Sequence, residues 1–472
     1  MVNENCGVVG IYSFDKQNVI PLIIDSLRAL QHRGQEAWGI AIPNKNPIKK
    51  LGLVSSSHLE FDRIINEYSS HLAIGHVRYS TIGKNNLDNA QPLKVHDLCI
   101  AHNGTISNTT ELSNMVGGCT FTPQNTTDTL LAAKRLLSLT QKTGELSEAL
   151  SILKNEMVGS YCFTFLDNSS VYAARDPQGF RPLVLGSIDQ KTFVIASESC
   201  ALSVIDAKLI RDVKPGEFIK INEDGLKTKM FSTTKNQSHC SFEFTYFAHP
   251  SSNMEGSNIY LARKNIGRFL AKKFPINSDL VIPVPDSARP AALGYASELG
   301  IPFDEGLLKD RYSKKGTLRS FIEPQQEDRV DINKWIVPIS EIIRDKHVVI
   351  IDDSLVRGTS SKAIVNTLKK SGARKISMLI TYPPIMYPCY AGIDFPSQTE
   401  LATYNENITT EKETIEKVRK YIGANFLGYN DSQNLANAIG IPLNSLCFTC
   451  STGNYDSLGI KPSFKTRKEL KG

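Results

Sequence analysis

The sequence predicts an α/β fold with a parallel sheet for the second half of the chain. Residues 348–351 form an unbroken β-branched run, which is typical of a central parallel strand buried on both faces. The amphipathic pattern that follows predicts a helix through Lys370, with Gly372 at its C′ position. Residues 376–380 predict the next strand, and residues 280–298 repeat the same strand–loop–helix order.

Length and composition set the limits of this interpretation. The chain has 472 residues, too many for one ordinary core, so two or three domains are expected. It is 41% hydrophobic and 22% charged, as soluble globular proteins are, and no apolar run approaches the roughly 20 residues of a membrane span. The N-terminus lacks the pattern of a secretory signal. The net charge of +6 has both signs interspersed, so we expect small anionic substrates rather than nucleic acid or membrane.

The loop after residues 348–351 carries groups suited to a phosphorylated sugar. Asp352 and Asp353 end the strand, where ligands of open α/β sheets bind, and their carboxylates could hold ribose hydroxyls or Mg²⁺. Gly358 permits a close backbone approach, and the hydroxyls of residues 359–361 offer donors to phosphate oxygens. For the two carboxylates alone, an ordinary βαβ unit with a surface Asp pair is the alternative.

Residues 347–361 closely resemble the 5-phosphoribosyl-1-pyrophosphate (PRPP) signature of type I phosphoribosyltransferases. The resemblance implies that a second domain, residues 231–472, binds PRPP together with Mg²⁺. Ser287 would lie near the metal-bound pyrophosphate, although an N-cap serine explains it equally well. The implied PRPP ligands are Asp352, Asp353, Ser354, Arg357, Gly358, Thr359, Ser360 and Ser361, and the implied Mg²⁺ ligands are Ser287, Asp352 and Asp353.

Cys6 leads directly into residues 8–12, an apolar stretch that predicts a strand. If residues 1–5 were removed, the α-amine of Cys6, with a pKa near ~8, could be the base for its own thiol. On position alone, a small buried residue at the start of a strand is the favoured alternative. Polar motifs at the ends of later elements favour the nucleophile instead, because site residues usually lie at such positions. These motifs are residues 31–36, 75–81, 102–104 and 126–129.

Together with residues 175–183, 196–201 and 214–217, these motifs resemble class II glutamine amidotransferases of the N-terminal-nucleophile (Ntn) hydrolase type across residues 6–230. The resemblance implies an αββα sandwich in which Cys6 attacks the glutamine side-chain amide and releases ammonia. Leu130 and Trp38 depart from the residues usual in that family. The implied roles are an oxyanion hole for Asn103 and Gly104, an α-carboxylate contact for Arg78, an α-ammonium contact for Asp128 and a supporting role for Arg33.

The connection between the halves is polar over residues 222–239, and we place the domain boundary there. Residues 240–250 alternate in a way that predicts a strand. Residues 309–324 include a basic, glycine-containing segment, residues 313–319, which suits a lid over a polyphosphate, although a solvated loop has the same composition. The lid is longer than in relatives, and residues 334–337 depart from the Lys-Leu-Asn that relatives carry.

Nine scattered cysteines do not form the pattern of a secreted disulfide framework, so a cytoplasmic location is expected. Cys447 and Cys450 form a Cys-x-x-Cys pair, and Cys240 and Cys389 could complete a four-thiolate site. Zinc, redox chemistry and coincidence are all compatible with the pair, and spacing does not separate zinc from an iron–sulfur cluster. Buried apolar positions are expected for the other cysteines, Cys99, Cys119, Cys162 and Cys200.

Taken together, the two halves and the cysteine segments are similar to the amidophosphoribosyltransferase family, in its Bacillus-type branch. That resemblance implies a [4Fe–4S] cluster on Cys240, Cys389, Cys447 and Cys450, one Mg²⁺ per subunit, nucleotide inhibitors and a homotetramer. The implied reaction converts glutamine, PRPP and water into 5-phosphoribosylamine, glutamate and pyrophosphate, the first step of purine synthesis. Ammonia would pass internally between the sites. The alternatives are a glutaminase that feeds another acceptor and a PRPP-sensing regulator that does not catalyse.

Overall fold

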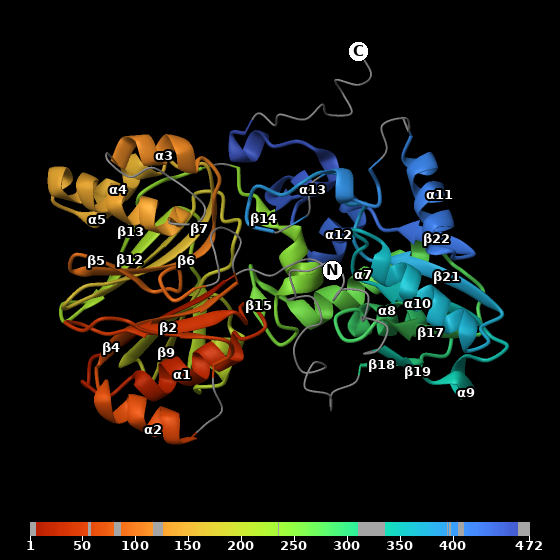
Figure 1. Cartoon of the computed structure of the whole chain (residues 1–472), viewed down its shortest axis with the longest axis horizontal. Helices are drawn as coiled ribbons and strands as arrows, with labels where there is room; N and C mark the ends of the chain where they lie inside the picture. The colour runs from red at the N-terminus through yellow and green to blue at the C-terminus, as the bar shows by residue number, and fades with distance from the viewer. Residues whose placement is uncertain are drawn as a thin grey trace, which may run out of the picture.

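The computed structural model describes residues 6–54, 58–79, 86–116, 126–234, 236–309, 336–393, 395, 398–404 and 410–460. The expected propeptide 1–5, Cys119, most of the lid and residues 334–335 therefore lie outside the described residues. Figure 1 shows two bodies side by side, one with stacked sheets and one built around a smaller sheet. Within the described ranges, no helix is long and apolar enough to cross a membrane.

Two antiparallel sheets face each other in the first half (Figure 1), with strand orders β11-β9-β10-β1-β4-β2-β3 and β13-β12-β8-β7-β6-β5. The first sheet comprises β1 (Gly7–Ser13), β2 (Ala37–Ala41), β3 (Ile48–Leu51), β4 (Leu72–Arg78), β9 (Val184–Ile188), β10 (Thr192–Ala196) and β11 (Lys208–Asp212). The second comprises β5 (Leu93–Val95), β6 (Leu98–Ile106), β7 (Gly159–Leu166), β8 (Val171–Arg175), β12 (Glu217–Asn222) and β13 (Gly225–Met230). The strand β13 pairs with β12, so the polar connection begins with a strand of this sheet.

Helices cover both outer faces of this pair of sheets, which confirms the predicted αββα sandwich. The helices α1 (Ile20–Ala29) and α2 (His58–Glu67) lie on the first sheet, and α3 (Thr109–Val116), α4 (Asp128–Thr143) and α5 (Leu146–Leu153) lie on the second. A short helix, α6 (Cys200–Ser203), follows β10. Cys99 and Cys162 are buried between the sheets and Cys200 is buried beneath α1, as predicted.

The second half is built on a parallel sheet of order β17-β20-β21-β22, as the sequence predicts. Its strands are β17 (Leu280–Pro283), β20 (His347–Asp352), β21 (Lys375–Ile380) and β22 (Phe426–Tyr429). Val349 and Ile351 pack against α7 (Ile259–Lys273) and α8 (Arg289–Leu299). Val348 and Ile350 pack on the opposite face against α10 (Thr359–Lys370) and α11 (Glu411–Ile422). The central strand is therefore buried on both faces.

Short elements complete the chain. They are β15 (Asn253–Met254), β16 (Ser257–Asn258), β18 (Leu307–Lys309), β19 (Ile336–Pro338), α9 (Ser340–Ile343), η3 (Gln398–Glu400), α12 (Ser432–Ile439), η4 (Leu443–Ser445), α13 (Thr449–Thr452) and η5 (Asp456–Leu458). At the junction of the two halves, β14 (His239–Cys240) pairs in parallel with β23 (Leu446–Cys447).

The strand predicted for residues 240–250 is wrong. The strand β14 ends at Cys240, and a π-helix, η1 (Glu243–Phe247), follows it. Phe242, Phe244 and Phe247 are all buried against C-terminal segments. The alternating pattern predicts a strand with one buried and one solvent-exposed face, and this stretch has no such exposed face.

Candidate functional sites

The candidate nucleophile, Cys6, lies immediately before β1, next to the end of β4. Its side chain is 9% exposed, and its thiol donates a hydrogen bond to the carbonyl oxygen of Tyr79 at 3.5 Å. Burial raises the pKa of the thiol to about 11. The thiol is therefore protonated at neutral pH, and a base must remove its proton before it can attack.

Two oppositely charged side chains, Arg78 at the end of β4 and Asp128 at the start of α4, lie close enough to Cys6 to affect its thiol electrostatically. The Asp128 carboxylate is held by the backbone N–H groups of Thr129, at 2.8 Å, and Ile106, at 3.0 Å. A buried guanidinium and a fixed carboxylate beside a thiol can bind the two charged groups of a free amino acid.

Asn103 and Gly104 lie on β6, in the sheet that faces β1. The Asn103 amide makes one long contact, at 3.5 Å, to the hydroxyl of Ser197, and its Oδ1 has no hydrogen-bond partner among the described residues. Gly104 has a φ of +146°, and a Cβ there would lie 2.1 Å from the carbonyl oxygen of Ser160, so only glycine fits. The side-chain amide of Asn103 has few other hydrogen bonds, and it is followed by a position that only glycine can occupy. Such a pair of N–H donors is suited to stabilising an oxyanion.

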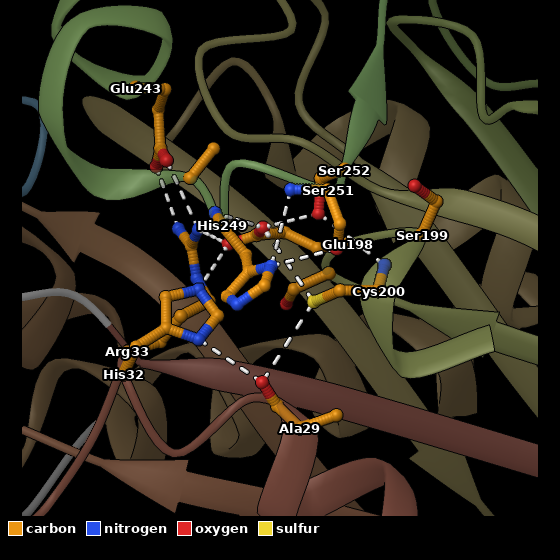
Figure 2. A network of polar contacts seen from close by, with 12 residues as sticks. Ala29, His32, Arg33, Glu198, Ser199, Cys200, Glu243, His249, Ser251 and Ser252 are labelled. Atoms are coloured by element: carbon orange, nitrogen blue, oxygen red, sulfur yellow. Dashed lines mark hydrogen bonds and ion pairs between the residues drawn. The ribbon is translucent and has the colours of Figure 1, made fainter. Parts of the chain in front are cut away.

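Arg33 forms a fully buried network, which Figure 2 shows. Its Nε donates to the carbonyl oxygen of Cys6 at 3.1 Å. Its two terminal nitrogens donate to Glu243 at 2.7 and 3.0 Å, and one of them also donates to Glu198. Burial alone would lower the pKa of Arg33, but the two carboxylates outweigh it and raise the pKa above its usual value.

The ring of His32, the carboxylate of Glu198 and the sulfur of Cys200 lie within 4.8 Å of one another, a spacing that a metal ion could use (Figure 2). Both oxygens of Glu198 are already bonded: one accepts from His32 at 2.8 Å and from Arg33, and the other accepts from Ser252 at 2.7 Å. Burial favours a raised pKa for Glu198, but His32 and Arg33 hold it well below its usual value. We therefore interpret this cluster as a hydrogen-bonding centre that fixes Arg33.

The second site lies at the carboxyl ends of β17 and β20. The hydroxyl of Ser287 donates to Asp353, and Asp352 accepts the backbone N–H of Asp353 at 2.9 Å. Burial raises the pKa of both carboxyls, and for Asp352 the charge of Asp353 adds to the effect. At Asp353, the hydrogen bonds from Ser287 and Ser354 and the charge of Arg263 oppose this rise in pKa but do not cancel it. Two adjacent buried carboxyls with raised pKa values fit a divalent cation, which would neutralise them.

The loop that follows adopts the shape expected of a phosphate cradle. Gly358 has a φ of +76° and is the N-cap of α10, which opens with three hydroxyl residues. The hydroxyl of Ser354 donates to Asp353 at 2.8 Å. Arg357 donates to Glu400 at 3.2 and 3.3 Å, so its guanidinium is held at the rim. Among the hydroxyls of the first turn, Thr359 is exposed, Ser360 is half-buried and Ser361 is buried.

The four cysteines of the candidate cluster come together at the junction. Cys240 and Cys447 are register partners in the β14–β23 pair. Cys389 and Cys447 lie close enough to Cys450 to raise the pKa of its thiol electrostatically. Burial raises the pKa of all four thiols, to about 12 for Cys240. Arg181 opposes this effect at Cys240, Cys389 and Cys447.

The donor set of these four residues fits a metal–sulfur group. All four cysteines are among the described residues, and each offers one sulfur. Four thiolates can hold either a zinc ion or an iron–sulfur cluster.

Sequence reasoning missed three charged residues of the first site. Glu198 lies within a motif that points to the amidotransferase fold, but no role was predicted for it. Arg181 likewise lies within the motif 175–183 with no role predicted for it, and Glu243 was considered only as part of the predicted strand 240–250. A signal for Glu243 exists, because it is the one charged residue in the aromatic stretch 240–248. A carboxylate in such a run must find a buried partner if the run is buried.

Comparison with known proteins divides the chain in the same way. The model of a glutamine amidotransferase domain matches residues 76–204, and the model of a phosphoribosyl transferase domain matches residues 257–384. The chain is 38% identical to the amidophosphoribosyltransferase of Mycobacterium bovis over 467 residues, which cover 96% of this chain and 86% of that protein. It is 37% identical to the amidophosphoribosyltransferase of Methanocaldococcus jannaschii over 475 residues, 95% of this chain and 97% of that one.

A solved structure matches over the same length. It is the glutamine PRPP amidotransferase of B. subtilis complexed with ADP and GMP, at 35% identity and a TM-score of 0.82. The match covers 95% of this chain and 97% of that chain. Both halves and their order are thus those of one known type of two-domain protein.

Proposed function

The chain belongs to the amidophosphoribosyltransferase family, and from that premise we propose how its residues divide the reaction between two sites. Its activity is the glutamine-dependent conversion of PRPP into 5-phosphoribosylamine, with glutamate and pyrophosphate as the other products, in the first step of de novo purine synthesis. The observation that carries the division is the placement of Cys6 within electrostatic reach of both Arg78 and Asp128.

In the first site, Cys6 is the nucleophile and its α-amine, freed by removal of residues 1–5, takes the proton from the thiol. The raised pKa of the thiol supports the need for that base. Arg78 and Asp128 hold the α-carboxylate and α-ammonium of glutamine. The amide of Asn103 and the backbone N–H of Gly104 stabilise the oxyanion, ammonia leaves, and water then cleaves the γ-glutamyl thioester.

In the second site, the α10 N-terminus and its hydroxyls bind the 5-phosphate, and Ser287, Asp352 and Asp353 hold one Mg²⁺. When bound, Mg²⁺ neutralises the departing pyrophosphate. The remaining work is positioning, because ammonia attacks C1 of the ribose without a covalent intermediate on the protein. We propose that ammonia passes from the first site to the second inside the protein.

We also propose that Cys240, Cys389, Cys447 and Cys450 hold one [4Fe–4S] cluster per subunit. Support comes from the set of four buried thiols, from the adjacent Arg181, and from the backbone N–H of Ala391, which donates to the sulfur of Cys389 at 3.3 Å. We propose that the role of the cluster is structural. None of the eight described cysteines forms a disulfide, which supports a reducing, cytoplasmic location.

The assembly and its regulation complete the proposal. We extend the homotetramer to this chain on the strength of the resemblance, and we extend nucleotide inhibition to it because the B. subtilis structure holds ADP and GMP. Light scattering during gel filtration tests the first. Inhibition of product formation by added adenine and guanine nucleotides tests the second.

The test of the proposed function is pyrophosphate release by anaerobically purified protein, which should require PRPP together with glutamine or ammonia. Cys6→Ser should abolish the glutamine-dependent reaction and leave the ammonia-dependent one within about twofold of the unsubstituted rate. Cys99→Ser, at a buried cysteine of the same domain, is the matched control and should retain both. Binding of PRPP without turnover would instead identify a regulator, and loss of both reactions in Cys6→Ser would contradict separate sites.

A further inference from the structure

A carboxylate from the second half completes the surroundings of the nucleophile in the first. Glu243 lies on η1, beyond the polar connection, and is 1% exposed. Its oxygens accept from Arg33 at 2.7 and 3.0 Å, across 210 residues of sequence. Arg33 in turn donates from Nε to the carbonyl oxygen of Cys6 at 3.1 Å. One guanidinium therefore joins the residue that carries the thiol to the opposite half of the molecule.

The geometry makes this contact directional. A guanidinium is a rigid plane with five N–H donors, so fixing its two terminal nitrogens also fixes the direction of its Nε–H. Glu243 engages both terminal nitrogens of Arg33, whereas Glu198 engages one. Without Glu243 the plane could turn about its remaining contact with Glu198, and the carbonyl of Cys6 would lose its fixed donor.

Glu243 is itself held from both halves. Arg181 of the first half donates to it at 3.1 Å. The π-helix that carries it is tied to α7 by Arg263, which donates to the carbonyl oxygens of Phe244 at 2.9 Å and Ala248 at 2.8 Å. The backbone of Glu243 is thus anchored in the second half, while its carboxylate contacts Arg33 and Arg181 of the first.

We propose that Glu243 is a positioning residue for glutamine hydrolysis: a carboxylate from the phosphoribosyltransferase half that orients Arg33 and, through it, the backbone of Cys6. The inference rests on the proposed role of Cys6 as nucleophile. Glu243 does not touch the reacting atoms. Its role is to fix the position of the Cys6 thiol relative to the glutamine amide. A displacement of about 1 Å at a reacting centre can lower a rate by about 100-fold.

The experiment compares Glu243→Gln with the unsubstituted, anaerobically purified full chain. The substitution keeps the size of the side chain but removes the charge that pairs with Arg33. We expect kcat for glutamine hydrolysis to fall by about 100-fold with little change in KM, because Arg78 and Asp128 still bind the substrate. The ammonia-dependent reaction should stay within about twofold. Labelling of Cys6 by the diazoketone analogue of glutamine, followed by mass spectrometry, should slow in parallel.

The matched control is Glu255→Gln. Glu255 also lies in the second half and forms an ion pair with a buried arginine of the first, Arg175, at 2.6 Å, but it contacts neither Arg33 nor Cys6. It should therefore retain both activities. Glu243→Asp keeps the charge but shortens the reach, and a glutaminase rate between those of Glu243→Gln and the unsubstituted chain would support positioning by the charge.

Three results would overturn the proposal. One is an unchanged glutaminase rate in Glu243→Gln. Another is an equal loss in Glu255→Gln, which would mean that any broken pair across the junction has the same effect. The third is a parallel loss of the ammonia-dependent reaction and of thermal stability in both Glu243 variants, which would make the residue structural. A failure of the proposed function is distinguishable, because the unsubstituted chain would then make no product from PRPP and ammonia.

Discussion

The hydroxyl of Ser287 donates a hydrogen bond to the carboxylate of Asp353, joining the ends of two neighbouring parallel strands across 66 residues of sequence. The contact brings together the only two segments from which Mg²⁺ ligands were predicted. It also accounts for Ser287 better than an N-cap does, because α8 begins at Arg289 with no side-chain cap.

Ser287→Ala should raise the KM for PRPP in the ammonia-dependent reaction. A hydrogen bond to a charged group contributes about 1.5–3 kcal/mol, which corresponds to roughly a 10- to 100-fold change in affinity. Steady-state kinetics at varied PRPP and Mg²⁺ measure the effect. Ser340→Ala, at the first residue of α9, is the control, and an unchanged KM in Ser287→Ala would show that the serine does not serve the substrate.

Glu400→Gln should lower the KM for PRPP. In the structure Arg357 donates to Glu400 at 3.2 and 3.3 Å, and that pair must break if Arg357 is to reach a phosphate. Because the pair is partly exposed, it is worth about 0.2–1 kcal/mol, so the expected gain is up to roughly fivefold. Glu400→Asp, which keeps the charge, should change the KM less. A higher KM in Glu400→Gln would mean that the glutamate orients Arg357 for binding.

The free energy of unfolding should fall as the pH drops from about 6.5 toward 3, in part because of His76. Burial lowers the pKa of His76 to about 3, so the folded chain keeps this ring neutral while the unfolded chain protonates it. Protons therefore favour the unfolded chain, and the stabilisation present above pH 6.5 is lost on acidification.

Urea unfolding at several pH values measures this effect. His76→Asn should be less stable at pH 7 but should lose less stability between pH 7 and 4 than the unsubstituted chain. His96→Asn, at an exposed histidine, controls for the removal of a ring and should leave the slope unchanged. An equal slope in His76→Asn would show that other groups, such as the buried His102, dominate the acid response.

Cys240→Ser should remove iron and sulfide from the anaerobically purified protein and lower its melting temperature. The reason is that β14 and β23 meet at Cys240 and Cys447, so the proposed cluster would join the junction to the C-terminal segment. Elemental analysis and calorimetry measure both effects, with Cys99→Ser as control. Zinc in place of iron and sulfide in the unsubstituted protein would contradict the proposed cluster.

The sequence predicted best where local pattern and tertiary environment agree. The unit around β20 is the example: four β-branched residues predicted a doubly buried strand, and helix signals predicted the end of α10 at Lys370 and the left-handed glycine at Gly372. The loop between them was read correctly as a turn into a helix N-terminus, because glycine and hydroxyl residues have local meaning there.

The sequence predicted worst at the junction of the halves. Within the stretch 240–250, residues 243–247 fold as a π-helix and three aromatic side chains are buried, and that burial involves segments as far as some 200 residues away. The ion pairs of Glu243 with Arg33 and Arg181 were missed for the same reason, since no local signal specifies a partner. Cys6 was selected as the candidate nucleophile because of the polar motifs at the ends of later elements, since its position alone favoured a small buried residue.

The pairing of β14 with β23 has a consequence for the order in which the molecule is assembled. The first of these strands leaves the ribosome long before the second is synthesised, as the 206 residues between Ser241 and Cys447 show. A growing chain can therefore fold its first sandwich before β23 exists to pair with β14. A chain that ended before Leu446 would lack this strand pair, and its two halves would depend on the remaining contacts across the junction, such as those of Glu243 with Arg33 and Arg181.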